Sequence, residues 1–291
     1  MPDWLIVLII GTVVGIIPGL FGVGGGFLTV PLLHVFAGVP LHLCVGLSSS
    51  QALGPVTTGM LHRHELGKLE WRIGLIMIGG TIVGLLFGIE FLEWATKSAG
   101  MWHLWGRDIP GTKIIIPLTN LALLVSLSAL VAWEYHHNRS GDAELERGWL
   151  DHLYLPPYVV LPELNGRRAS ITLLQSIAMV IGFFNGGLGM GGAIVMMPAL
   201  VYLVGVDTHR AVTATLVVSW LNSIVGTVRH AWLGNIDLWL VCLLLVGGGV
   251  GAKFGSWLND RLSGRSLRGY FSLLILASAG LVAWEIAVLF W

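Results

Sequence analysis

Two glycine-rich phrases contain the residues of this sequence that are best suited to binding chemistry. Their glycines are Gly22, Gly24, Gly25 and Gly26 in the first phrase, and Gly189, Gly191 and Gly192 in the second. Without Cβ atoms, consecutive glycines can turn their N–H groups toward one point and hold an anion. A helix beginning directly after each phrase adds about half a positive charge at its N-terminus. The two phrases therefore predict an anion site built from backbone rather than from lysine or arginine.

Polar side chains also recur at helical spacing in the apolar segment that follows each phrase. They are Ser48 and Gln51 in the first half, and Thr215, Ser219 and Asn222 in the second, with Asn185 beside the second phrase. Residues three or four positions apart lie on one face of a helix. Hydroxyls and amides on such a face can donate hydrogen bonds to the oxygens of an oxyanion, so we add them to the candidate site.

Ordinary helix packing explains part of the same pattern. Glycines allow membrane helices to approach closely, and serine or threonine hydroxyls can bond to carbonyls of their own helix. His42 and His209 occupy matching positions just before an apolar span. Capping or interface placement is one interpretation of these histidines, and proton coupling is another. From the sequence, both the packing and the binding interpretations stay open.

The composition requires lipid as the solvent for much of the chain. Hydrophobic residues make up 55% of it and charged residues 11%, with a mean hydropathy of +0.81. A soluble protein carries about 25% charged residues, so this chain has too few to cover a surface in water. The formal net charge of zero argues against a nucleic-acid partner, because binding phosphates needs a basic excess. We predict a protein integrated in a lipid bilayer, without a cofactor, a metal site or enzymatic activity.

Apolar segments of about 20 residues can cross the hydrocarbon core as helices. Six such segments lie at 43–61, 71–92, 114–133, 211–229, 238–257 and 269–290. Two further apolar regions are interrupted by the glycine phrases, with arms at 5–17 and 27–37, and at 171–184 and 194–204. Each arm is too short to cross the membrane upright. Each interrupted region therefore predicts a hairpin, or a pair of short helices, that meets at mid-depth.

A shift of 167 residues aligns the two halves of the chain without a gap. Positions 15–88 then match positions 182–255, and Pro31 falls on Pro198. An ungapped register that holds both glycine phrases and this proline indicates an internal duplication. Each half would contain one glycine-broken region and three full transmembrane helices.

The predicted architecture is an all-α polytopic membrane protein made of two repeats. The first repeat covers residues 1–133, a polar connector covers 134–168, and the second repeat covers 169–291. The connector is rich in charged residues and contains a Pro-Pro turn, so we expect it to lie in water. The two repeats together would form one transport domain.

The distribution of lysine and arginine predicts that the halves are inverted. If each glycine-broken region is a hairpin, one side of the membrane carries twelve of these residues and the other side four. The four are Lys97, Arg107, Lys113 and Arg229. If each region crossed once, the same residues would divide evenly, which the positive-inside rule disfavours. We therefore expect both termini outside and the connector in the cytoplasm of a bacterial inner membrane.

Inverted repeats with discontinuous helices are the architecture of secondary transporters, which bind their substrate near mid-membrane. A small anion is the substrate that the glycine phrases favour. A transporter or channel for another small solute, such as a metal cation, is the alternative. A cation site would need carboxylates within the membrane, and the middles of the predicted spans contain none.

The two phrases also resemble the paired signature of a known family. Residues 22–33 read Gly-Val-Gly-Gly-Gly-Phe-Leu-Thr-Val-Pro-Leu-Leu, and residues 189–200 read Gly-Met-Gly-Gly-Ala-Ile-Val-Met-Met-Pro-Ala-Leu. Together with 209–215 and 251–255, they are similar to the TauE/SafE family over both apolar halves. The resemblance implies a permease, often an exporter, for sulfite, organosulfonates or related sulfur anions. A coupling proton or sodium ion stays open as a further partner.

We predict that residues 3 and 140 lie on opposite sides of the membrane. Single cysteines introduced as Asp3→Cys and Ser140→Cys, with Cys44 and Cys242 replaced, should react with a membrane-impermeant maleimide from opposite faces. The physical reason is the odd number of crossings in the first half. Labelling of both positions from the same face would contradict the inverted arrangement.

Overall fold

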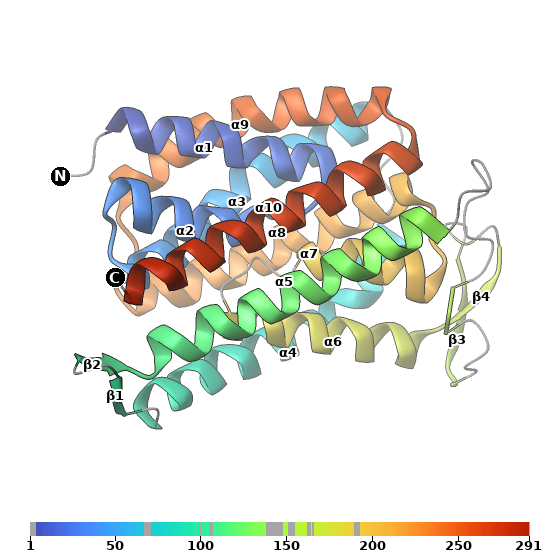
Figure 1. Cartoon of the computed structure of the whole chain (residues 1–291). Helices are drawn as coiled ribbons and strands as arrows, with labels where there is room; N and C mark the ends of the chain where they lie inside the picture. Colours follow the sequence, from blue (N-terminus) through green and yellow to red (C-terminus); the bar gives the residue numbers. More distant parts are fainter. Residues whose placement is uncertain are drawn as a thin grey trace.

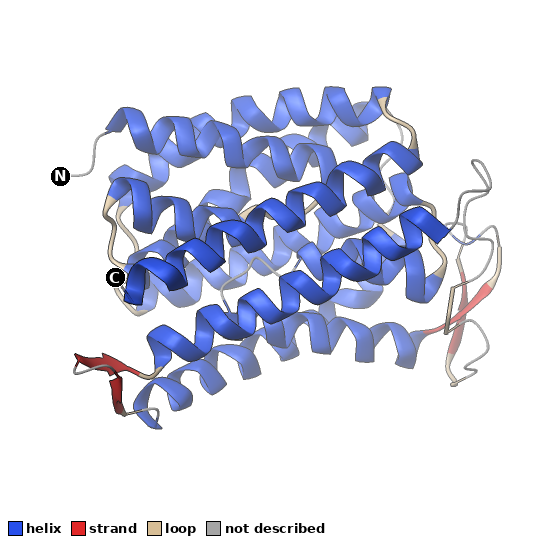
Figure 2. Cartoon of the chain, in the orientation of Figure 1, coloured by secondary structure: helices blue, strands red, loops and turns tan. Residues whose placement is uncertain are grey.

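The computed structural model describes residues 4–66, 71–98, 100–104, 107–137, 148–150, 155–161, 164, 166–188 and 193–290. It is a bundle of helices with a short β-hairpin at each end (Figure 1; Figure 2). The predicted all-α polytopic membrane fold is confirmed, with the two small hairpins as additions outside the bundle.

The helices follow the apolar pattern of the sequence closely. They are α1 (Trp4–Phe21), α2 (Gly26–Ala37), α3 (Leu41–Glu65), α4 (Arg72–Ser98), α5 (Thr112–His137), α6 (Ile171–Leu188), α7 (Ala193–Pro198), a π-helical segment (Ala199–Val204), α8 (Thr208–Trp232), α9 (Leu238–Arg261) and α10 (Gly264–Phe290). The six predicted spans correspond to α3, α4, α5, α8, α9 and α10. Among the described residues, α1, α4, α8, α9 and α10 contain windows long and apolar enough to cross a membrane.

Both glycine-broken regions form hairpins. In Figure 1, α1 begins at the end of the bundle that holds both chain termini, and α2 returns toward that end. We call it the terminal end. The second hairpin, α6 with α7 and the π-helical segment, starts from the opposite end, beside β3 and β4. We call that end the connector end, because the described part of the connector lies there.

The first arm of each hairpin is longer than the sequence suggested. α1 and α6 contain 18 residues each, which is about 27 Å of helix, so neither is a short half-span. Pro18, expected within the break, lies inside α1, and Asn185 lies inside α6. Pro18 removes one helical hydrogen bond, but the turn covers the carbonyl that this frees. A Cβ built on Gly25 would lie 3.2 Å from the carbonyl oxygen of Val14.

Glycines let each first arm pack backbone to backbone against one full-length helix. A Cβ added at Gly15 of α1 would collide with the carbonyl oxygen of Gly248 on α9. A Cβ added at Gly182 of α6 would collide in the same way with Thr81 on α4. These two helix pairs, α1 with α9 and α4 with α6, are the most extensive among the described helices. The glycines in the first arms of the hairpins therefore allow close helix packing, as the packing interpretation expects.

The close contacts recur at the offset of 167 residues. Gly84 approaches the carbonyl oxygen of Met179, and Gly251 approaches that of Thr12. Both residues of the first contact are related by this offset to residues of the second. The other pairings follow the same rule, because α3 packs on α9 as α8 packs on α4, while α3 packs on α8 and α5 on α10. The inverted repeat itself stays a prediction, and this packing agrees with it.

Local signals explain where several helices begin and end. Asp207 caps α8 by accepting hydrogen bonds from the N–H groups of His209 at 2.9 Å and Arg210 at 3.1 Å. Asp237 caps α9 in the same way. A carboxylate at this position satisfies free N–H groups and favours the positive end of the helix dipole. α2 ends at Gly38, whose left-handed backbone lets its N–H bond to a preceding carbonyl.

The polar inserts contain the two β-hairpins. β1 (Met101–Leu104) pairs with β2 (Arg107–Pro110) at the terminal end, and β3 (Tyr158–Val160) pairs with β4 (Arg168–Ser170) at the connector end. The connector also bonds to the bundle, because the N–H of Trp149 donates to the carbonyl of Tyr202 in the π-helical segment at 2.9 Å. The described part of the connector is therefore attached to the second hairpin.

We expect Gly84→Ala and Gly251→Ala each to destabilise the protein by about 1–3 kcal/mol, the usual cost of overpacking. In both variants a methyl group would meet the backbone of the neighbouring helix. Gly280→Ala on α10 is the matched control, because no atom lies within 4 Å of its added Cβ. Thermal unfolding in detergent measures the difference. A control that loses as much stability would show that close crossing is not the cause.

Candidate functional site

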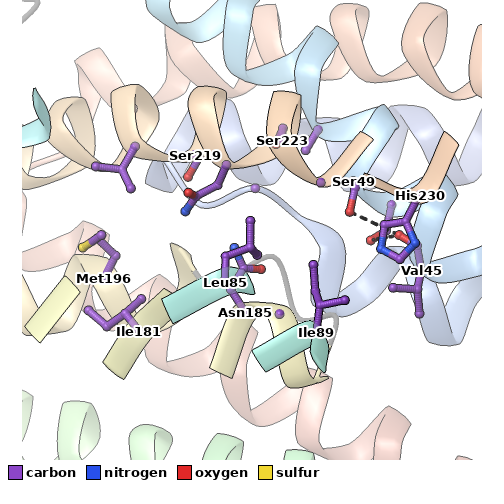
Figure 3. A pocket seen from close by; sticks show the side chains of 17 residues that line it. Val45, Ser49, Leu85, Ile89, Ile181, Asn185, Met196, Ser219, Ser223 and His230 are labelled. Carbon is purple, nitrogen blue, oxygen red and sulfur yellow. Dashed lines mark hydrogen bonds between the residues drawn. The ribbon is translucent and has the colours of Figure 1, made fainter. Parts of the chain in front are cut away.

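A cavity of ≈ 40 Å³ lies between the two hairpins and the pair α3 and α8. Its polar lining residues are Ser48 and Ser49 on α3, Asn185 on α6, and Ser219, Asn222, Ser223 and His230 on α8. Figure 3 shows Ser219, Ser223 and His230 along α8 on one side, with Asn185 on the other. Hydrogen-bonding groups from three helices therefore converge on one small space.

The backbone of both hairpins borders this cavity. Gly24 lines it from the turn of the first hairpin, and Gly186 lines it from the last turns of α6. Met196 of α7 closes the end of the cavity that faces the second hairpin. Leu85 and Ile89 of α4 form an apolar wall beside Asn185 (Figure 3). The cavity thus lies beside the turn of the first hairpin and the last turns of α6.

Three buried polar atoms of the lining have no hydrogen-bond partner among the described residues. They are Ser219 Oγ, Asn222 Oδ1 and His230 Nδ1. A buried polar group left without a partner costs about 1–3 kcal/mol. A ligand or water that bonds to these groups would recover that cost, so the lining favours the binding of a polar ligand or water.

Among the described residues that line the cavity, none is aspartate, glutamate, lysine or arginine. Their donors are neutral hydroxyls and amides, together with the imidazole of His230. The hydroxyls of Ser48 and Ser49 donate to the carbonyl of Val45 at 3.2 and 3.3 Å, within their own helix. These bonds hold the hydroxyls in place and leave their oxygens available as acceptors.

Five of the predicted site residues line the cavity, namely Gly24, Ser48, Asn185, Ser219 and Asn222. Gln51 does not line it and instead joins two helices. Its Oε1 accepts a 2.6 Å hydrogen bond from Thr29 Oγ1 on α2, and both side chains are buried. Gln51 therefore fixes the returning arm of the first hairpin to α3, directly after the glycine turn.

Thr215 also lies outside the lining. Its hydroxyl donates to the carbonyl of Ala211 at 2.7 Å, within α8, and the residue is fully buried. This is the arrangement that the packing interpretation described for hydroxyls in membrane helices. Thr215 lies one turn from Ser219, so the two positions form a matched pair for experiments.

The remaining glycines of the first phrase shape the turn. Gly22 and Gly25 have φ values of 71° and 66°, in the left-handed region that side chains rarely adopt. The carbonyl of Gly25 accepts the first hydrogen bonds of α2, from the N–H groups of Leu28 at 3.0 Å and Thr29 at 3.2 Å. Gly26 is the first residue of α2. The second phrase cannot be compared, since Gly189, Gly191 and Gly192 lie outside the described residues.

The sequence analysis missed three polar lining residues, Ser49, Ser223 and His230. Ser49 lies beside the predicted Ser48, and Ser223 lies beside the predicted Asn222, so the polar face of each helix is wider than predicted. His230 lies about two turns beyond Asn222 on α8, outside the predicted set. The signal that could have found Ser49 and Ser223 is their direct adjacency to the predicted positions, because two neighbouring residues of a helix can border the same space.

Comparisons with known proteins agree with the resemblance of the glycine phrases. The profile of the family described as "Sulfite exporter TauE/SafE" matches residues 7–282. The chain is 24% identical over 274 residues to the probable membrane transporter protein YunE of Bacillus subtilis, covering 91% of this chain and 92% of that protein. It is 28% identical over 279 residues to the probable membrane transporter protein YjnA of the same organism, covering 94% and 96%. No solved structure matches the chain significantly.

We expect Gly25→Ala to destabilise the protein more than Gly38→Ala. Both substitutions place a side chain at positive φ, which costs roughly 1–2 kcal/mol. Only at Gly25 would the new Cβ also press on Val14 Cγ1, at 2.7 Å, whereas nothing lies within 4 Å of it at Gly38. Unfolding temperatures in detergent test this, and equal losses would mean that the turn can relax.

Proposed function

The chain belongs to the sulfite exporter TauE/SafE family and is a membrane transporter, and we propose that it carries a small sulfur oxyanion such as sulfite. The site of transport in this proposal is the cavity between the two hairpins. The observation that carries the proposal is the lining, whose described residues offer converging hydroxyl and amide groups and include no acidic side chain.

The chemistry of the lining suits an oxyanion with diffuse charge. Each oxygen of sulfite or of a sulfonate accepts hydrogen bonds, and Ser219, Asn222 and Asn185 can donate through hydroxyl or amide groups. His230 Nδ1 also borders the cavity and, like Ser219 Oγ, has no hydrogen-bond partner among the described residues. α2 begins at Gly26, two residues after Gly24 in the lining, so the positive end of its dipole lies near the cavity.

The size of the cavity favours the smallest members of this substrate class. A site needs roughly 10–15 Å³ to hold one water, so ≈ 40 Å³ corresponds to about three or four waters. A sulfur atom together with its oxygens occupies about the volume of these waters. A larger organosulfonate would need the hairpins to move apart, which the alternating-access cycle of such transporters provides.

We place the moving parts at the hairpins and at the pair α3 and α8. Each hairpin is attached by its first arm to one full-length helix, so α1 with α9 and α6 with α4 form two tightly packed units. In the proposed cycle these units rock against α3 and α8, which carry the polar lining. Access to the cavity would then alternate between the terminal end and the connector end.

The proposal includes a direction of transport and the membrane in which the protein lies. The resemblance to exporters and the excess of basic residues on one side favour a bacterial inner membrane with both termini outside. Export would then run from the connector end toward the terminal end. His230, near the terminal end of α8, is the candidate for coupling to a proton, with a sodium ion as the alternative coupling partner.

A carrier or channel for a metal cation is the second candidate function. Reconstituted in liposomes, the protein should move sulfite but neither Mn²⁺ nor Zn²⁺. Empty liposomes and heat-denatured protein are the controls for leakage. Cation flux in the absence of sulfite flux would favour the second candidate and contradict the first.

We expect Ser219→Ala and Asn222→Leu each to reduce sulfite flux at least about tenfold. Losing a hydrogen bond to a charged ligand costs about 1.5–3 kcal/mol, and 1.4 kcal/mol already corresponds to a factor of ten. Thr215→Val on the same helix is the control, and its flux should stay within about twofold, because its hydroxyl bonds within α8. A control that loses as much flux as Ser219→Ala would show that α8 packing, rather than the cavity, limits transport.

A further inference from the structure

Arg63 is a fully buried arginine at the connector end of α3. Arg63 is 2% exposed, and its Nη2 donates a hydrogen bond to Asn259 Oδ1 on α9. Nε is buried and has no hydrogen-bond partner among the described residues. Asp260, next to Asn259 on α9, acts electrostatically on the guanidinium, and its carboxylate also pairs with His62 at 2.7 Å.

The guanidinium is connected to the first hairpin through Asn259. The side-chain amide of Asn259 donates to the carbonyl of Leu20, in the last turn of α1 before the glycine turn. His209, at the start of α8, lies with Nδ1 3.3 Å from Asn259 Oδ1. Arg63 therefore contacts a junction of α1, α8 and α9, and any movement of the first hairpin would be transmitted to it.

The position of Arg63 corresponds to that of His230 in the other half. The offset of 167 residues relates the two, and it also relates Gly59 to Gly226, one turn earlier in each helix. Gly226 borders the cavity and faces Ser49, whereas Gly59 faces Leu216, at 3.3 Å from an added Cβ. The region around Arg63 is therefore the counterpart of the cavity. It lies beside α1 and α9, as the cavity lies beside α6 and α4.

This counterpart is closed where the cavity is open. Val56, which corresponds to Ser223, and Leu216, which corresponds to Ser49, are both fully buried and pack in one apolar cluster. Ser256 lies beside them, fully buried, and its Oγ has no hydrogen-bond partner among the described residues. Bulky apolar side chains fill this half, yet it keeps two unpartnered polar groups, Arg63 Nε and Ser256 Oγ.

We propose that Arg63 and Ser256 form a second anion site at the connector end, closed in this structure, through which the substrate enters or leaves the cavity. The inference deepens the proposed function and rests on it. A small oxyanion binds the guanidinium there when the first hairpin moves and Asn259 is released. The site is distinct from the cavity, because Arg63 lies eleven residues beyond Ala52 of the lining, about 16 Å along α3.

The free-energy cost of burying the guanidinium of Arg63 supports this assignment. Burial of an arginine in a membrane protein normally requires a counter-charge. The guanidinium of Arg63 bonds to a neutral amide, and the nearby Asp260 is shared with His62. Its planar set of donors matches an oxyanion in a bidentate arrangement, and its bond to an amide is weaker than a bond to an anion. A passing anion supplies a charged acceptor for Nε, which has no partner among the described residues, and the guanidinium returns to the bond with Asn259 once the substrate has left.

The test is the effect of Arg63→Gln on sulfite uptake from each side. Right-side-out and inside-out membrane vesicles present opposite ends of the protein, and a cysteine at the exposed Ser263 identifies the connector end by labelling. We expect the sulfite concentration for half-maximal uptake from the connector end to rise at least about tenfold. Uptake from the terminal end should change by no more than about twofold.

Two further variants separate binding from folding. Arg63→Lys keeps the charge and should retain more of the connector-end uptake than Arg63→Gln, even if the glutamine variant proves unstable. His62→Gln, on the adjacent residue, removes the surface pair with Asp260 and should leave both directions within about twofold.

The outcomes distinguish the two proposals. In a folded Arg63→Gln protein, the sulfite concentration for half-maximal uptake could change equally from both sides or not at all. Either result would overturn the connector-end site. Sulfite flux through the wild-type protein would still uphold the proposed function. A loss in Arg63→Lys equal to that in Arg63→Gln would overturn it as well. A wild-type protein that moves no sulfite in either vesicle type would overturn the proposed function, and the connector-end site would fall with it.

Discussion

Unpaired backbone groups cost several kcal/mol each in hydrocarbon, so a helix interrupted at mid-membrane must bury its interruption in protein. Backbone contact between each hairpin and one full-length helix provides that burial here. Gly15 against Gly248 and Gly182 against Thr81 bring the backbones closer than any side chain would allow. With the first arms held in this way, the turn of the first hairpin and the last turns of α6 are placed beside α3 and α8, and the cavity follows from that placement.

The cavity and its counterpart differ because the side chains of the two halves have diverged while the backbone packing has not. Small polar residues such as Ser49 and Ser223 leave space on one side, whereas Leu216 and Val56 fill the corresponding space on the other. The bundle therefore combines helix packing that recurs in the two halves with an asymmetric filling of the space between helices by side chains.

The way the charges are arranged agrees with an anion as cargo. The described lining of the cavity offers neutral donors, and the buried Arg63 at the connector end bonds to the neutral amide of Asn259. In the proposed cycle, neutral donors would bind a diffuse charge weakly enough to release it, while the guanidinium of Arg63 would attract the anion toward the entrance. Strong binding at both places would trap the proposed substrate.

The sequence by itself indicated the membrane class, the positions of the long helices, the glycine turn of the first hairpin and an offset of 167 residues at which close contacts recur, since hydropathy and glycine spacing act locally along the chain. It also named Gly24, Ser48, Asn185, Ser219 and Asn222, which line the cavity, because glycine clusters and polar residues stand out in long apolar segments. Only the tertiary structure decided that Gln51 joins α2 to α3, and that the space opens beside Ser49 and His230 but closes beside Leu216. Those outcomes depend on the rotation of each helix and on which neighbour faces it, and neither is encoded in the spacing of a single segment.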